Sequence, residues 1–101
     1  MARNRVELSG RLLERGQLRH TPAGVAALEF KLVHESEQQE AGVTRKVQAE
    51  IAAIAFEAQA RLMAARPLGS PVKVEGFLSA KSKRAKRLML HVTNIEFVEG
   101  E

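Results

Sequence analysis

The sequence contains no cysteine, no tryptophan and no tyrosine, and only three prolines in 101 residues. Without cysteine the chain cannot form a disulfide, ligate a metal through a thiolate or use a thiolate as a nucleophile. No apolar run approaches the roughly 20 residues that a membrane span needs. The N-terminal segment MARNRVELSG lacks the apolar stretch of a signal peptide. We therefore expect a cytoplasmic protein that does not associate with a membrane.

Sequence motifs of catalysis are also absent. The chain has no glycine-rich phosphate loop, no dinucleotide-binding fingerprint and no metalloprotease helix. Its three histidines, His20, His34 and His91, lie too far apart in the sequence to have the spacing of a metal cluster, and we interpret them as structural or surface residues. We expect no enzymatic activity, no metal site and no cofactor.

The chain has the size and composition of one globular domain, with 45% hydrophobic and 28% charged residues. Alternation of apolar and polar residues with a period of two is typical of half-buried strands. This pattern predicts strands at residues 4–14, 27–35, 45–54, 72–78 and 88–98. A change of phase near Thr93 predicts a β-bulge in the last strand, and Gly10 predicts a bend or bulge in the first.

The segments between the expected strands have signals of their own. Pro22 and Gly24 predict a tight hairpin turn, because proline presets φ and glycine accepts positive φ. The polar residues 36–44 are interpreted as a connection. Phe56, Ala60 and Met63, at positions i, i+4 and i+7, predict one short helix over residues 56–66. Pro67 and Gly69 are expected to end it.

Three strands, one helix and two strands in this order match the OB-fold, a five-stranded, partly open barrel that binds oligonucleotides or oligosaccharides. We therefore predict an all-β protein with a single OB-fold domain over residues 1–101 and one short helix between the third and fourth strands. An SH3-like barrel and an α+β sandwich are the alternative folds that the pattern allows.

One short segment, KSKRAKR at residues 81–87, carries the positive charge of the chain. Five of the 16 basic residues lie in it, which leaves 11 basic residues against 12 acidic ones elsewhere. In an OB-fold this loop is one of those that close over a bound strand. The candidate nucleic-acid-binding residues are Lys81, Lys83, Arg84, Lys86 and Arg87 in the loop, with Arg45 and Lys46 where the third strand begins. The alternative is a solvated hairpin tip that is charged for solubility.

The expected binding depends on charge more than on stacking. If all five loop cations contact phosphates of single-stranded DNA, log affinity should fall against log salt with a slope of about −3.5, at about 0.7 per contact. Aromatic platforms for bases are scarce, because the chain has only four phenylalanines. Phe30, Phe56 and Phe97 fit core positions, and for Phe77 we favour a core or barrel-edge role over a base platform. We therefore expect weak sequence selectivity and strong salt dependence.

The chain contains the stretches NRVELSGRL, LRHTPAGVAALEFKLVHES, EAGVTRKVQAEI, VKVEGFLSAKSK and LMLHVTNIEFVE. Together they resemble the primosomal replication protein N (PriB) family of bacteria, a relative of the bacterial single-stranded DNA-binding proteins. The likeness covers nearly the whole chain, about residues 4 to 99. The TPAG turn and the strand after it are shared with single-stranded DNA-binding proteins generally. The HES and EAG stretches and GFLSAKSK are more particular to the PriB family.

The resemblance implies a homodimeric OB-fold that binds single-stranded DNA and has no catalytic activity. It implies a role in restarting stalled replication forks, in which the family stabilises the PriA helicase on DNA and helps to recruit DnaT. It also implies that lysines of the loop contact DNA, which matches Lys81, Lys83 and either Lys86 or Arg87. The basic position at the start of the third strand matches Arg45.

The chain differs from the family pattern at positions that bear on binding. Val43 and Gln48 stand where familiar members carry aromatic residues, and Glu35 stands where they carry a basic residue after the histidine. These differences remove expected stacking contacts. Either Arg84 and Arg87 compensate through charge, or the protein binds DNA less tightly than its relatives and relies more on the helicase.

Two other binding functions stay open, each without a primosome role. One is a general single-stranded DNA-binding protein, a class that carries a long tail with an acidic tip, which we do not expect here. The other is an RNA-binding OB-fold module, for which a basic loop would serve equally well. The dimer surface is expected at the edge of the first strand or on the polar faces of the second and third strands.

Overall fold

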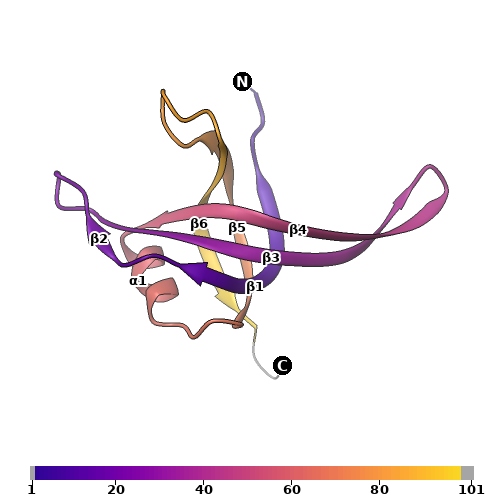
Figure 1. The fold of residues 1–101 in the computed structure, drawn as a ribbon, viewed down its shortest axis with the longest axis horizontal. Helices are drawn as coiled ribbons and strands as arrows, with labels where there is room; N and C mark the ends of the chain where they lie inside the picture. The colour runs from indigo at the N-terminus through magenta and orange to yellow at the C-terminus, as the bar shows by residue number, and fades with distance from the viewer. Residues whose placement is uncertain (1, 99–101) are drawn as a thin grey trace.

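The computed structural model describes residues 2–98 and shows a small β-barrel with one helix (Figure 1). The elements are β1 (Val6–Arg15), β2 (Arg19–His20), β3 (Ala26–Glu40), β4 (Val43–Phe56), α1 (Ala58–Ala64), β5 (Pro71–Ala80) and β6 (Leu88–Phe97). Over the described range, no helix has both the length and the apolar character that crossing a membrane requires.

Five long strands close into a barrel. The strand order is β1-β5-β6-β4-β3-β2, and the pairing of β1 with β3 closes the circle. All neighbouring strands are antiparallel except β4 and β6, which run parallel over residues 53–55 of β4. Helix α1 follows β4 and packs against β3, β4 and β6 at one end of the barrel. The prediction of an OB-fold with one helix between the third and fourth barrel strands is confirmed.

The core consists of aliphatic side chains that alternate inward along the strands. Leu12 of β1, Leu28 and Leu32 of β3 and Leu90 of β6 are each at most 1% exposed. Met63 of α1 is also fully buried and closes one end of the barrel. Burial of one such side chain stabilises the fold by about 1.5–3 kcal/mol. The apolar residues of the alternating pattern that predicted the strands are therefore the side chains that form this core.

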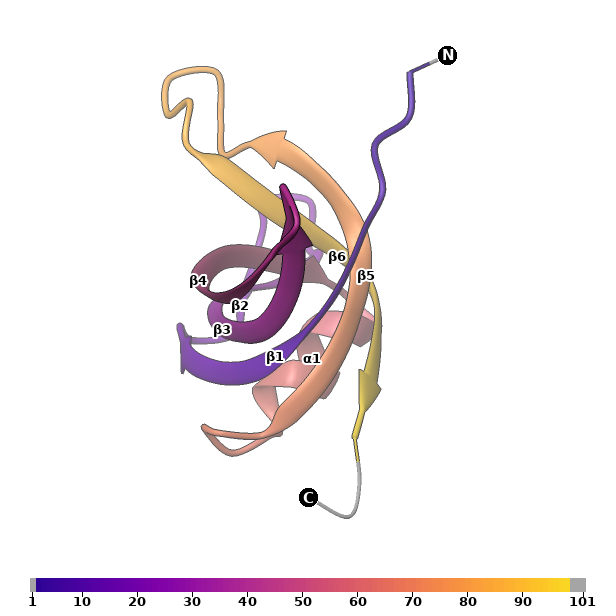
Figure 2. The same cartoon turned by 90° about the vertical axis from the view of Figure 1, so that its right-hand side faces the viewer.

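Strand β1 bends so that it pairs with two other strands (Figure 2). Its first half pairs with β5 and its second half with β3, and Arg11 takes part in both ladders. At the bend, a Cβ added to Gly10 would lie 2.6 Å from the carbonyl oxygen of Val33, so glycine allows this close approach. A register shift between Leu12 and Glu14 marks a bulge just beyond. The predicted bend or bulge in this strand is confirmed.

The predicted bulge near Thr93 is also confirmed. Glu75 and Gly76 are neighbours on β5, yet their partners on β6 are Asn94 and Val92, so Thr93 between them is the extra residue. Because of this extra residue, Val92 and Ile95 both face the core although they are three residues apart on β6. The bulge therefore explains the change of phase in the sequence.

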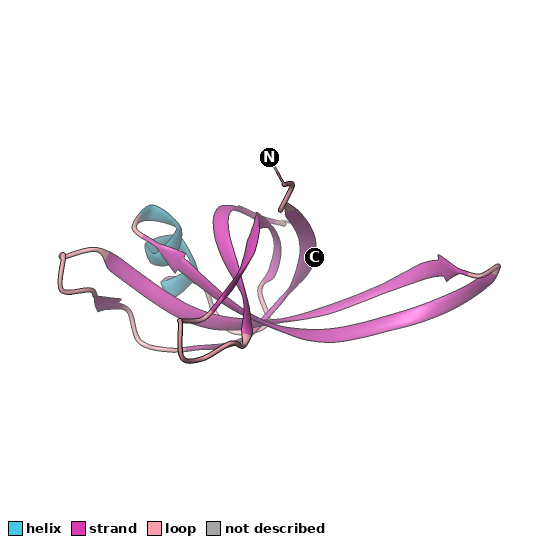
Figure 3. Ribbon diagram, turned by 90° about the horizontal axis from the view of Figure 1, so that it is seen from above, coloured by secondary structure: helices cyan, strands magenta, loops and turns pink. Residues whose placement is uncertain are grey.

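The interpretation of residues 36–44 as a connection is wrong, because these residues extend two strands. β3 and β4 stay paired out to Glu40 and Val43, and only the two residues between them form the turn, both with positive φ. Residues 36–47 thus form a hairpin that projects from the barrel, which we call the arm (Figures 1 and 3). Most side chains of the arm are exposed on both faces, so its sequence has no apolar alternation.

Helix α1 is shorter than the predicted range of 56–66. Phe56 still belongs to β4, and Glu57 has a positive φ of 54°, which separates the strand from the helix. The backbone N–H of Glu57 donates to the carbonyl of Ala26 (2.8 Å), and the Glu57 carboxylate accepts from the backbone N–H of Ala26 (3.2 Å). Phe56 is 39% exposed, so its predicted core position is wrong.

The predicted turn at Pro22 and Gly24 is confirmed. The backbone N–H groups of Thr21 and Gly24 donate to the carbonyls of Val25 (2.9 Å) and Thr21 (2.8 Å). The turn joins β3 to the short strand β2, whose two residues are too few to show any alternation in the sequence.

Candidate nucleic-acid interface

The basic loop, residues 81–87 between β5 and β6, is a closed turn that lies above the barrel in Figure 2. The backbone N–H of Lys81 donates to the carbonyl of Arg87 (2.8 Å), which closes the base of the loop. At the tip, the N–H of Ser82 donates to the carbonyl of Ala85 (3.0 Å), and the N–H of Ala85 donates to the Ser82 hydroxyl (2.8 Å). These bonds occupy the backbone, and all five basic side chains are exposed.

Most of the charge on the basic loop is not neutralised within the described part of the chain. Lys81 Nζ lies 3.5 Å from Oε1 of Glu29, which also pairs with Arg19. Four loop cations make no ion pair with a carboxylate of residues 2–98: Lys83, Arg84, Lys86 and Arg87. These four are free to bind phosphates, whereas Lys81 first has to leave an exposed pair, which costs little.

A groove of about 360 Å³ runs beneath the basic loop. Its lining includes Lys81 and Arg87 of the loop, Lys31 of β3 and Met89 of β6, together with two glutamates. Met89 is only 5% exposed, yet it lies outside the main cluster of buried core side chains. The groove therefore connects the basic loop with the outer face of the barrel.

The other two candidate residues, Arg45 and Lys46, lie on the arm. Arg45 is eight residues along β4 from Ala53, where pairing with β6 begins, a span of about 26 Å at about 3.3 Å per residue. Arg45 Nε pairs with Oε1 of Glu40 at 2.7 Å, and Lys46 lies opposite Glu37 in the ladder. Within one chain, the structure therefore does not bring Arg45 and Lys46 together with the basic loop.

Three aromatic side chains form a row on the outer face of the barrel, which we call the aromatic row. Phe77 of β5 and His91 of β6 are cross-strand partners, and their rings stack with centroids 5.0 Å apart and planes 17° apart. The ring of Phe56 on β4 lies 6.3 Å from that of His91 at an angle of 33°. Both phenylalanines are 39% exposed. His91 follows Met89 by two residues on β6, so the two side chains lie on the same face of that strand.

The sequence contained signals for two members of this row. For Phe77 the sequence favoured a core or barrel-edge role, and the core role is wrong, because Phe77 is 39% exposed. Its alternation with Lys73 and Glu75 is the signal that places it on the outer face. His91 alternates with buried neighbours on β6, which also places it outside. Phe56 carried no such signal, because it lies where the strand period gives way to the helix period.

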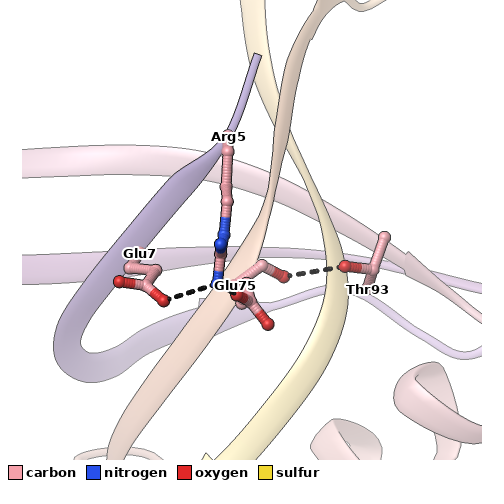
Figure 4. A network of polar contacts seen from close by, with 4 residues as sticks. All are labelled: Arg5, Glu7, Glu75 and Thr93. Carbon is pink, nitrogen blue, oxygen red and sulfur yellow. Dashed lines mark hydrogen bonds and ion pairs between the residues drawn. The ribbon is translucent and has the colours of Figure 1, made fainter. Parts of the chain in front are cut away.

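Arg5 forms ion pairs with two carboxylates, one on β1 and one on β5 (Figure 4). Its Nη2 atom contacts Oε1 of Glu7 (2.8 Å) and Oε2 of Glu75, whose backbone carbonyl accepts from the Thr93 hydroxyl (3.2 Å). The hydrogen bond to Glu75 and its charge, followed by the charge of Glu7, raise the pKa of Arg5 above its ordinary value. Continuing the pairing of β1 with β5 by one residue places Arg5 opposite Phe77. Acidic groups at this end of the row are therefore held by a cation.

The histidines do not assemble a metal site within the described residues. His34 uses both ring nitrogens in hydrogen bonds, Nδ1 with the carbonyl of Ser9 (2.7 Å) and Nε2 with the Ser36 hydroxyl (2.8 Å). Within residues 2–98, no three His, Asp or Glu side chains are grouped closely enough to hold a metal ion. What this surface offers to a ligand is a set of cations on one loop and a row of rings beside it.

Comparison with known proteins places this fold in one class. The profile of a family described as "another single-strand binding protein family" matches residues 4–94. This match defines the class, that of single-strand binding proteins. The replication restart protein PriB of Bordetella pertussis is 46% identical over 97 residues, which cover 96% of this chain and 91% of that protein.

Two solved structures agree with this match. The protein PriB from Ralstonia solanacearum has a TM-score of 0.85 at 30% identity, over 95% of this chain and 98% of that one. A deletion mutant of the single-stranded DNA binding protein from Thermus aquaticus has a TM-score of 0.75 at 27% identity, over 96% of this chain and 51% of that one. The chain therefore belongs to the single-strand binding proteins and, among these, to the PriB family of replication restart proteins.

Proposed function

We propose that the protein is a non-catalytic, single-stranded DNA-binding accessory protein of the replication-restart primosome. In this proposal it works in the cytoplasm as a homodimer, stabilises the PriA helicase on DNA and helps to recruit DnaT. The observation that carries the proposal is the basic loop, in which four of the five cations form no ion pair with a carboxylate of residues 2–98. Membership of the PriB family supports the link to replication restart.

In this mechanism the phosphates of a single strand bind the basic loop while the strand lies in the groove beneath it. Each phosphate that a cation neutralises releases condensed counterions, so affinity falls as salt rises. If the four unpaired loop cations engage, the slope of log affinity against log salt is about −2.8, and if Lys81 leaves Glu29 and joins them it is about −3.5. The slope therefore reports how many loop cations take part.

A homodimer would supply two basic loops and two arms. Residues 6–9 of β1 pair with β5 along one edge and, among the strands of residues 2–98, with none along the other. Pairing of this edge with a second copy across a two-fold axis would cover an open strand edge, which supports β1 as the dimer surface. Two loops on one DNA strand would also strengthen binding through a higher effective concentration.

DNA binding is tested with a dye-labelled dT oligonucleotide and fluorescence anisotropy across a salt series. The double variant Lys83→Ala with Arg84→Ala should bind more weakly and have a slope shallower by about 1.4, because two contacts are lost. The matched control is Lys73→Ala with Arg61→Ala, which removes the same charge away from the loop and should change the slope little. Equal losses for both doubles would refute the loop as the phosphate site.

The arm is tested separately, with Arg45→Ala and Lys46→Ala made together. These residues stay candidates for DNA contact, and a loss of affinity with a shallower salt slope supports them. Affinity and slope equal to those of the native protein would remove the arm from the DNA site.

The primosome role requires its own measurement. PriA unwinding of a forked DNA, and retention of DnaT on that DNA, should both increase when the protein is added. If the protein binds the dT oligonucleotide but changes neither, a general single-stranded DNA-binding role is the better account. Tighter binding of an RNA competitor than of DNA would point instead to an RNA-binding module.

A further inference from the structure

We propose that one end of the barrel is a docking surface for a partner protein, and that it takes an acidic segment that also carries apolar side chains. This surface, which we call the arginine corner, is formed by residues 11–16 at the end of β1 and by residues 66–70 between α1 and β5. The inference goes beyond the proposed function and does not rest on it. Three observations carry it: arginines without a carboxylate partner, exposed leucines beside them, and the position of the surface on the barrel.

The two segments of the arginine corner are bonded to each other. The backbone N–H of Leu12 donates to the carbonyl of Ser70 (3.0 Å), and the N–H of Gly69 donates to the carbonyl of Leu12 (2.7 Å). The hydroxyl of Ser70, a residue that is only 7% exposed, donates to the carbonyl of Pro67 (2.6 Å). The turn before β5 is therefore held against β1, and a partner would meet a surface that is already formed.

Three arginines surround this turn, and none of them forms an ion pair with a carboxylate of residues 2–98. Arg11 Nη1 donates to the carbonyl of Gly69 (3.2 Å), and Arg15 Nη1 donates to the carbonyl of Arg66. These bonds hold two guanidinium groups in place but do not neutralise their charge. The two segments contain one acidic residue, Glu14, so three positive charges stand against one negative charge.

Exposed leucines lie beside these arginines. Leu13 follows Leu12 on the first segment and is 36% exposed, and Leu68 precedes Gly69 on the second and is 59% exposed. Leu68 and Arg15 line the same hollow of about 480 Å³. Apolar side chains next to uncompensated arginines are complementary to a segment that has both apolar and acidic side chains.

The composition of the arginine corner suits a protein better than a nucleic acid. Its cations are all arginines, which bind carboxylates through two parallel hydrogen bonds and are enriched in protein interfaces, where lysines are depleted. The basic loop, in contrast, carries three lysines and two arginines. The guanidinium of Arg66 lies over the ring of Phe97, 4.1 Å from its centroid, so that face of the ring is not open to a base.

The arginine corner and the basic loop lie at opposite ends of β5. Residues 66–70 precede this strand and the basic loop follows it, and Figures 1 and 2 show them at the bottom and the top of the molecule. The ten residues of β5 span about 30 Å at about 3.3 Å per residue. The groove beneath the basic loop extends to Arg15, but Arg11 and Leu68 do not line it. An acidic segment on Arg11 and Leu68 would therefore leave the basic loop free for DNA.

The probe is a short, dye-labelled peptide of aspartates and leucines, and its binding is followed by fluorescence anisotropy. In two control peptides, serines replace the leucines or asparagines replace the aspartates. The native protein should bind the probe at least about fivefold more tightly than either control peptide, because each control lacks one of the two contacts. The double variant Arg11→Gln with Leu68→Ser should lose at least about fivefold in affinity for the probe and keep its affinity for the dT oligonucleotide.

The matched control protein is Lys46→Gln with Val43→Ser, two changes on the arm. It loses the same charge and an apolar side chain of the same exposure, since Val43 and Leu68 are both 59% exposed. Its affinity for the probe should equal that of the native protein. The loop variant Lys83→Ala with Arg84→Ala should also bind the probe as the native protein does, because the probe does not need the basic loop.

Backbone NMR of the native protein provides a reading that does not depend on the folding of any variant. The probe should shift the amide signals of residues 66–70 and leave those of residues 81–87 in place. A saturating amount of the dT oligonucleotide should leave the affinity for the probe unchanged. Failure of the proposed function is distinguishable, because the dT oligonucleotide would then not bind, whatever the probe does.

Several outcomes would overturn the inference. Absence of probe binding, or equal binding of the three peptides, would exclude this surface, and so would equal losses in the Arg11 and Leu68 variant and in its matched control. Loss of probe affinity in the loop variant, or displacement of the probe by dT, would place the probe on the basic loop. If the Arg11 and Leu68 variant loses affinity for dT but keeps it for the probe, the arginine corner is a DNA contact instead.

Discussion

Glycine-to-alanine substitutions provide a graded test of how closely the barrel strands pack. A Cβ added to Gly76 would lie 1.8 Å from a carbonyl oxygen of β6, and one added to Gly10 would lie 2.6 Å from a carbonyl oxygen of β3. At Gly16 the nearest atom is 3.5 Å away, which is ordinary contact. None of these three glycines has a positive φ, so the test isolates steric overlap from backbone strain. Stability should fall in the order Gly16→Ala, Gly10→Ala, Gly76→Ala.

The overlap sets the magnitudes. To restore ordinary contact, neighbouring strands would have to separate by about 0.8 Å at Gly10 and about 1.6 Å at Gly76, and close-packed interiors resist such shifts. Overpacking costs about 1–3 kcal/mol in typical cores, so we expect about 1–2 kcal/mol for Gly10→Ala and about 3 kcal/mol or more for Gly76→Ala. Gly16→Ala should stay within about 0.5 kcal/mol of the native protein. At about 4–8 °C per kcal/mol, Gly76→Ala should lower Tm by about 12 °C or more.

The assay is urea unfolding followed by circular dichroism, since the chain has no tryptophan to follow by fluorescence. Protein concentration is held fixed, because self-association would make the midpoint depend on it. Equal stability of the variants at Gly76 and Gly16 would refute the reasoning. Because the carbonyl oxygen that Gly76 approaches belongs to His91, whose ring stacks on Phe77, the Gly76 variant should also disturb the aromatic row.

Two further predictions concern charged side chains. The pKa of Glu57 lies below its ordinary value of 4.5, first because Arg61 donates a hydrogen bond to its carboxylate and second because the N–H of Ala26 does. This stabilisation is present above the unfolded-state pKa and is lost as pH falls through the folded-state pKa. Glu57→Gln should therefore flatten the acid side of the plot of unfolding free energy against pH, measured by urea unfolding. An unchanged plot would contradict this. Arg5→Ala leaves the carboxylates of Glu7 and Glu75 without their ion-pair partner. Because free carboxylates repel phosphates, the variant should bind DNA several-fold more weakly in low salt and nearly as well in high salt. An anisotropy titration in which that loss does not depend on salt would count against an electrostatic role.

The sequence predicts a strand where one face of that strand is buried. In β3, Leu28, Phe30 and Leu32 point inward, and their alternation predicts the strand directly. Further along the same strand both faces meet solvent, so the arm carries no pattern and resembles a connection. The start of α1 depends on the positive φ of Glu57. Hydrogen bonds between Glu57 and Ala26 of the distant strand β3 support this conformation, and local propensity does not indicate it.

The candidate site is predictable from the sequence only in part. The basic residues of the loop are adjacent in the chain, so a simple count of charge finds them. Whether Arg45 and Lys46 extend that patch depends on the length of the arm, which is set by pairing. The stack of Phe77 on His91 depends on the register of β5 against β6, including the bulge at Thr93. Register joins residues far apart in the sequence, and local patterns do not contain it.

The arm makes the reach of the protein independent of the stability of its barrel. Its two strands pair with each other beyond the barrel, so the gain or loss of two residues in each strand would preserve the register and leave the core intact. Each such step would move the tip by about 7 Å. Insertions and deletions can therefore change the distance between the cations of the arm and those of the loop in discrete steps, and this spacing can vary through evolution without selection on folding.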